Sequence, residues 1–316
     1  MKKICRLIRQ CFTPFSINHF VAYHLAAMAV LISVSIPTQG QDVVEVIKFD
    51  VSLVTVNVAV KDNKGRPLLG LKSNDFLITD ENDRVSPEYF ESEGPASIVF
   101  VLDTSSSMKG AKWKNLLEGL KSFLKKARLD NDYTLIAFDS RAYVVADSVS
   151  AEEFCRSLSE LKPVGDTALY DGVMLGLDAV KRARQRNRAL VLISDGEDNR
   201  SQAQLCEVER EAFSRRAIIY SVGVLLKDYC ARGIVEACNG KETIKQLAAI
   251  TGGVAFFPDD LQLARTLKDI GNEVNTQYSL SYYPTSKNAG WRTVHVAVAQ
   301  NQHSSKLRYQ QRYLMR

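Results

Sequence analysis

The chain has 316 residues, of which 46% are hydrophobic, and this length and composition fit one large globular domain or two smaller ones. Its formal net charge of +5 comes mainly from the first 40 residues, which contain Lys2, Lys3, Arg6 and Arg9 and no acidic side chain. The remaining residues contain 37 basic and 36 acidic side chains. A nearly neutral body without a run of Lys or Arg argues against nucleic acid or an anionic membrane as the main partner.

Residues 1–40 are predicted to be a signal peptide. Basic residues precede the apolar stretch 20–36, and small residues at Thr38 and Gly40 favour cleavage after Gly40. The mature protein is then exported to the periplasm, the cell envelope or the medium. The alternative is an uncleaved anchor, in which case the membrane becomes a partner, but a 17-residue apolar stretch is marginal for spanning a bilayer.

Four cysteines remain after this cleavage: Cys155, Cys206, Cys230 and Cys238. An even number in an exported chain favours disulfides over a thiolate metal site, and the spacing does not match a zinc-binding pattern. Three pairings are open. A Cys230–Cys238 disulfide is preferred because both residues lie in segment 227–242, which has the character of an insertion between a strand and a helix.

Residues 41–95 form an amino-terminal β segment in this interpretation. Strands are predicted at 51–60, where β-branched residues largely alternate, and at 75–80 and 88–91. A turn at 62–67 contains Gly65 and Pro67. The segment is too short to fold alone.

Residues 96–277 alternate between strands and helices. Strands are predicted at 97–102, 133–138, 142–146, 189–194, 217–225 and 254–257, and helices at 113–127, 151–161, 170–186, 205–216, 243–251 and 261–277. This alternation predicts an α/β fold, a doubly wound and mostly parallel sheet with helices on both faces.

Residues 278–316 return to β character, with strands predicted at 278–283, 292–299 and 306–313. This carboxy-terminal segment is expected to pack with residues 41–95 as one small β module beside the α/β domain. Each segment then buries an apolar face that it could not bury without the other.

The most informative stretch is Asp103-Thr104-Ser105-Ser106-Ser107, which directly follows an apolar predicted strand. Open α/β sheets bind their ligands at the carboxyl ends of strands. Carboxylate and hydroxyl oxygens are hard donors that suit Mg²⁺, Mn²⁺ or Ca²⁺ better than zinc. The alternative is a Ser-rich turn that caps the next helix.

Two later segments favour the metal site. Thr167 lies in a loop just before a predicted helix, and Asp195 follows a second apolar strand. Together the three segments resemble the metal-ion-dependent adhesion site of the von Willebrand factor A domain, and the resemblance extends over about 96–277. It implies Ser105, Ser107 and Thr167 as hydroxyl ligands, with Asp103 and Asp195 bound directly or through water.

A second resemblance covers nearly the whole mature chain. Residues 58–68 and 278–284 are similar to an A-domain-related family abundant in acidobacterial genomes. This likeness implies an exported bacterial protein and brings no established activity.

The sequence argues against an enzyme. After signal removal only His295 and His303 remain, both in the β tail, and there is no Gly-x-Ser-x-Gly elbow or phosphate-binding glycine loop. Further acids near the motif, Glu197, Asp198 and Asp171, could bind a second cation or tune the first. Glu197 and Asp198 are expected instead to be structural or to support the ligands without touching the ion, and the dipole of its helix accounts for Asp171.

These observations predict an exported, divalent-cation-dependent protein-binding module that acts in adhesion or assembly. Neutral hydroxyl ligands leave a cation electron-poor, and an Asp or Glu of a protein partner completes its coordination shell. The alternative is a structural cell-envelope scaffold whose metal site is stabilising or vestigial.

Overall fold

The computed structural model describes residues 53–215, 218–224, 235–259, 262–286, 288–299 and 305–315, with only the backbone described for 235–238. The predicted signal peptide and Cys230 lie outside these residues, and the side chain of Cys238 is not described, so the predicted Cys230–Cys238 disulfide stays a prediction. Within the described ranges, no helix has both the length and the apolar character needed to cross a membrane.

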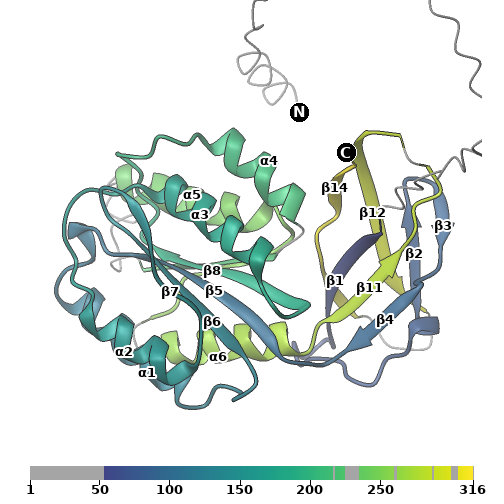
Figure 1. Cartoon of the computed structure of the whole chain (residues 1–316), viewed down its shortest axis with the longest axis horizontal. Helices are drawn as coiled ribbons and strands as arrows, with labels where there is room; N and C mark the ends of the chain where they lie inside the picture. Colours follow the sequence, from purple (N-terminus) through teal and green to yellow (C-terminus); the bar gives the residue numbers. More distant parts are fainter. Residues whose placement is uncertain are drawn as a thin grey trace, which may run out of the picture. The chain divides into compact units, whose positions relative to one another are not determined.

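A six-stranded sheet forms the centre of the α/β region, with strand order β10-β9-β8-β5-β6-β7 (Figure 1). Every neighbouring pair is parallel except β6 and β7, which are antiparallel. The strands are β5 (Ala96–Asp103), β6 (Asp132–Phe138), β7 (Ala142–Val149), β8 (Asn187–Ser194), β9 (Ile218–Gly223) and β10 (Ala255–Phe256).

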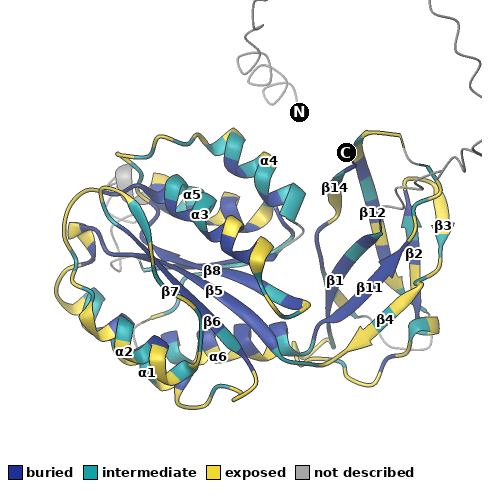
Figure 2. Cartoon of the chain, viewed as in Figure 1, coloured by how far each residue is buried: buried dark blue, intermediate teal, exposed yellow. Residues whose placement is uncertain are grey.

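In the part of the chain that the structure describes, six helices cover the two faces of this sheet: α1 (Ala111–Leu124), α2 (Ala151–Glu160), α3 (Leu169–Arg182), α4 (Leu205–Arg215), α5 (Val235–Ala249) and α6 (Leu263–Asn275). Apolar residues of α1, α2 and α6 share one core cluster, and those of α3, α4 and α5 share another. Strand β5 contributes Phe100 to the first cluster and Val101 to the second. Figure 2 shows that β5 is buried along its length, and a strand buried on both faces needs a continuous apolar run.

The β module consists of two antiparallel sheets, with orders β13-β1-β11-β4 and β14-β12-β2-β3. Its strands are β1 (Val54–Lys61), β2 (Phe76–Asp80), β3 (Asp83–Val85), β4 (Tyr89–Ser92), β11 (Tyr278–Tyr282), β12 (Gly290–Val298), β13 (Lys306–Arg308) and β14 (Arg312–Met315). Strand β1 pairs with β11 and β2 pairs with β12, so both ends of the chain contribute to each sheet. The predicted fold class, a mostly parallel doubly wound sheet with a small β module, is confirmed.

One predicted strand is wrong. Residues 306–313 were expected to form a single strand, but β13 pairs with β1 in one sheet and β14 pairs with β12 in the other. The chain crosses between the sheets at Tyr309 and Gln310, which are both buried. Gln310 Nε2 donates to the carbonyl oxygens of Phe213 and Arg312 at 2.9 and 2.7 Å, which replaces strand pairing at the crossover.

A buried carboxylate joins the last helix to the β module. Glu273 of α6 is 2% exposed. It accepts hydrogen bonds from Tyr220 Oη at 2.8 Å and from Arg308 Nη1 at 2.6 and 2.7 Å, and it also pairs with Lys61. The end of α6 is therefore bound to β9, β13 and β1 together.

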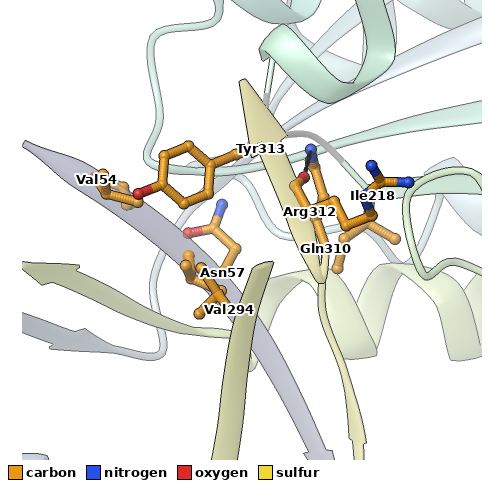
Figure 3. A pocket seen from close by; sticks show the side chains of 9 residues that line it. Val54, Asn57, Ile218, Val294, Gln310, Arg312 and Tyr313 are labelled. Atoms are coloured by element: carbon orange, nitrogen blue, oxygen red, sulfur yellow. Dashed lines mark hydrogen bonds between the residues drawn. The ribbon is translucent and has the colours of Figure 1, made fainter. Parts of the chain in front are cut away.

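A small cavity of about 10 Å³ lies at the same junction, lined by residues of β1, β9, β12 and β14. Figure 3 shows Asn57 and Val294 facing Gln310 and Ile218 across it. The side-chain oxygens of Asn57 and Gln310 are buried and have no hydrogen-bond partner among the described residues. The cavity has room for about one water molecule.

Candidate metal site

The site lies where two neighbouring parallel strands end. β5 ends at Asp103, and β8 ends at Ser194, one residue before Asp195. Leu102 pairs with Ile193, so the chain leaves both strands at the same level of the sheet. The carboxyl ends of parallel strands share one sheet edge, which is why residues far apart in the sequence meet here.

Asp103 is fully buried at the floor of the site. Its Oδ1 accepts the backbone N–H of Ser105 at 2.9 Å, and its Oδ2 accepts the hydroxyl of Ser194 at 2.6 Å. Burial, reinforced by the charge of Asp195, raises the pKa of the Asp103 carboxyl to about 6. Two carboxylates that lie close together away from water repel each other, and a cation bound beside them would stabilise their charged forms.

Two hydroxyls of the motif form a pair beside this carboxylate. Ser105 Oγ and Ser107 Oγ are 3.0 Å apart, and Ser105 is buried while Ser107 is exposed. Neither serine caps the following helix, because α1 begins after Gly110 and has no side-chain cap. The capping alternative therefore does not account for this pair.

Thr167 is buried and is held in place by its backbone. Its N–H donates to Asn199 Oδ1 at 2.9 Å, and its carbonyl accepts the N–H groups of Asn199 and Arg200 at 3.0 and 3.1 Å. The N–H of Ser106 donates to the carbonyl of Gly165 at 3.0 Å. These bonds connect the loop of Thr167 to the loops that follow β5 and β8.

Asp195 divides its two oxygens between two environments. Its side chain is 7% exposed, and Oδ2 lies 3.1 Å from the ammonium nitrogen of Lys112. Oδ1 is buried and has no hydrogen-bond partner among the described residues. Backbone geometry fixes this loop, since Gly196 has φ +87° and a Cβ there would lie 2.1 Å from the carbonyl oxygen of Gly240.

Lys112 was not among the predicted site residues. It lies in the first turn of α1, a position where the helix dipole disfavours a cation, and the first turn contains no acidic side chain to offset this. Lys109, Lys112 and Lys114 all follow the motif closely, so the sequence alone does not distinguish Lys112 from its neighbours.

Two of the neighbouring carboxylates have local structural roles. Asp198 accepts the N–H of Leu169 at 2.8 Å at the start of α3, and Asp171 accepts the N–H of Ala203 at 2.8 Å. Both bonds order the loops around Thr167 rather than adding an acid to the site. His295 is exposed on β12, in the β module, and His303 lies outside the described residues.

The donor set fits a divalent cation. The two carboxylates and three hydroxyls of the predicted ligands would supply oxygen donors, and the unpartnered Asp195 Oδ1 is an acceptor that a metal or its bound water would satisfy. In the described part of the chain, no group of three or more His, Cys, Asp or Glu side chains is arranged to hold a metal, and the candidate site itself combines only two carboxylates with hydroxyls.

One family model matches part of this region. Residues 98–197 match the family model of the von Willebrand factor type A domain. The match runs from β5 to the loop after β8 and includes all five predicted metal ligands. Together with the fold, it supports a von Willebrand factor A domain in this part of the chain. The more specific acidobacterial resemblance stays a prediction.

Curated relatives are distant. The chain is 23% identical over 184 residues to inter-alpha-trypsin inhibitor heavy chain H3 of Bos taurus, covering 48% of this chain and 21% of that protein. It is 28% identical over 181 residues to Uncharacterized protein sll0103 of Synechocystis sp., covering 56% and 41%. The matches therefore span less than half the length of these relatives.

Solved structures are also similar at low identity. The von Willebrand factor type A protein from Catenulispora acidiphila is 13% identical, with 78% of this chain and 75% of that chain covered and a TM-score of 0.48. Proximal thread matrix protein 1 from the mussel byssus, in a form with a zinc-occupied MIDAS motif, is 17% identical, with 62% and 50% covered and a TM-score of 0.48.

Proposed function

We propose that the protein is an exported, divalent-cation-dependent protein-binding module for adhesion or assembly. Asp103, Ser105, Ser107, Thr167 and Asp195 hold the ion, which is Mg²⁺, Mn²⁺ or Ca²⁺. The observation that carries this proposal is the pair of buried carboxylates at one sheet edge, one of them with an unpartnered oxygen.

The residues of the site have different roles in binding the ion. Asp103, held by Ser105 N–H and Ser194 Oγ, supplies fixed negative charge at the floor. Hydroxyl ligands add no charge, so the ion keeps its attraction for a further anion. The exposed Ser107 marks the side from which an Asp or Glu of a protein partner reaches the ion and forms a charge-assisted bond.

A structural scaffold of the cell envelope is the second candidate. The observation in its favour is the Lys112–Asp195 ion pair, which neutralises one carboxylate without any metal. In that case the site stabilises the fold or is vestigial, and partners do not depend on a cation.

Calorimetric titration with Mn²⁺ and Mg²⁺ tests the proposal. The wild type is expected to bind and Asp103→Ala to lose binding while keeping its circular dichroism spectrum. Ser106→Ala, at an exposed position of the same loop outside the ligand set, is the matched control. Equal cation affinity in Asp103→Ala would overturn the assignment. Loss of partners with EDTA separates the binding module from the scaffold, which keeps them.

Export and domain organisation are part of the same proposal. We propose cleavage after Gly40, followed by a β segment to residue 95, the A domain over 96–277 and a second β segment over 278–316. Intact-mass measurement of secreted material, before and after reduction, tests the cleavage and the Cys230–Cys238 disulfide. A mass that includes residues 1–40 would indicate an anchored protein.

A further inference from the structure

Lys112 places a positively charged side chain within the candidate site. Its ammonium nitrogen lies 3.1 Å from Asp195 Oδ2, and its side chain is only 13% exposed. A lysine is seldom buried this far unless it is paired. The pairing also connects residues 83 positions apart in the sequence, so local helix geometry does not produce it.

Helix α1 gives no other reason for a cation at this place. Lys112 is the second residue of the helix, where the dipole and the free backbone N–H groups already contribute positive charge. The unfavourable position is offset by the carboxylate of Asp195, which Lys112 contacts across the site. The lysine is therefore held by the metal site and not by its own helix.

We propose that Lys112 is a resident counter-cation of the metal site, which occupies Asp195 in the metal-free protein and sets the affinity of the site for a divalent ion. This inference rests on the proposed function. A divalent ion and an ammonium group that share one carboxylate repel each other, so the lysine lowers metal affinity whether it moves away or stays.

The same charge has a stabilising role before the metal arrives. With Lys112 in place, one of two buried carboxylates is neutralised, and a buried carboxylate left without its partner is strongly destabilising. If the lysine stays in place when a divalent ion is bound, two carboxylates, one ammonium and the ion leave a net positive site. Such a site attracts the carboxylate of a partner.

Calorimetric titration of the purified protein with MnCl₂ tests the inference, using Lys112→Met, Lys112→Gln, Lys112→Arg and Lys114→Met. Lys114 is exposed on the same helix and serves as the matched control. We expect Lys112→Met and Lys112→Gln to bind Mn²⁺ about tenfold more tightly, equivalent to about 1.4 kcal/mol. Lys112→Arg and Lys114→Met should stay close to the wild type. In EDTA, the two neutral variants should melt at a lower temperature than the wild type.

The outcomes distinguish this inference from the proposed function. If the wild type binds Mn²⁺ but both neutral variants bind equally or more weakly, Lys112 does not compete with the metal and the inference is wrong, while the metal site stands. If neither the wild type nor any Lys112 variant binds Mn²⁺, both the function and the inference are wrong. The Gln variant keeps a polar side chain at the position in case the Met variant fails to fold.

Discussion

Replacing Asp103 with Asn should make the metal-free protein more stable while it abolishes metal binding. The carboxylate is fully buried, and its two hydrogen bonds to Ser105 and Ser194 do not remove the cost of holding charge there. Asn has nearly the same shape and accepts one of these bonds. It differs mainly in having no charge, so the variant isolates the electrostatic cost of the site.

The magnitude follows from the pKa of Asp103, which the fold raises from 3.8 to about 6. A folded-state pKa above the unfolded value means that the folded protein prefers the protonated acid. The destabilisation is therefore complete above pH 6 and disappears as the pH falls below about 4. Two pKa units correspond to about 3 kcal/mol, a figure that already includes the hydrogen bonds to Ser105 and Ser194, because both lower the pKa. We therefore expect a gain of up to about 3 kcal/mol at pH 7.5.

Urea unfolding in EDTA at pH 7.5 and pH 4 measures this effect. We expect Asp103→Asn to exceed the wild type in free energy of unfolding at pH 7.5 and to lose that advantage at pH 4. Addition of Mg²⁺ should then stabilise the wild type alone. A variant that is less stable than the wild type at pH 7.5 would refute the reasoning. The charged Asp103 would then stabilise the metal-free fold, whereas we expect it to destabilise that fold.

Three further perturbations have defined outcomes. In the structure, the buried Arg292 lies 3.0 Å from Asp80. Asp80→Ala removes this partner and should lower the free energy of unfolding by about 3 to 5 kcal/mol in urea titrations. Gly196→Ala places a Cβ 2.1 Å from the carbonyl of Gly240 and should cost about 2 kcal/mol or more and weaken Mn²⁺ binding in calorimetry. Removal of Mg²⁺ with EDTA, from a concentration 100 times its Kd, should lower wild-type stability by about 2.7 kcal/mol in thermal unfolding; no change would mean that the folded protein does not bind Mg²⁺.

Strands whose burial is evident from their own residues were predictable from the sequence. β5 and β8 are buried on both faces, so each appears as an apolar run that ends in a polar residue. The pattern over 306–313 predicts a single strand, because alternation alone does not determine which neighbour a strand pairs with. Only the tertiary position of Gln310, bonded to Phe213 of α4, divides that segment between two sheets.

The sequence indicates the candidate site most directly where its residues follow one another. Asp103, Ser105 and Ser107 form a continuous motif, whereas Thr167 and Asp195 were assigned by family resemblance. Lys112 was missed because the polar face of α1 contains several lysines, and the sequence does not show which of them reaches across the site. The fold decides this, since it brings the start of α1 against the loop that follows β8.

The β module and the candidate metal site occupy opposite ends of the central strands. β5 begins at Ala96, directly after the module, and runs about 23 Å to Asp103. The chain leaves the α/β region beside its point of entry, since Gly94 N–H donates to the carbonyl of Asn275 at 3.1 Å at the end of α6. A partner that approached a bound cation would therefore meet the loops of Asp103, Thr167 and Asp195, whereas Glu273 joins the module to the other end of the domain. Among the described residues, the β module is thus separated from the loops that would determine which partner binds.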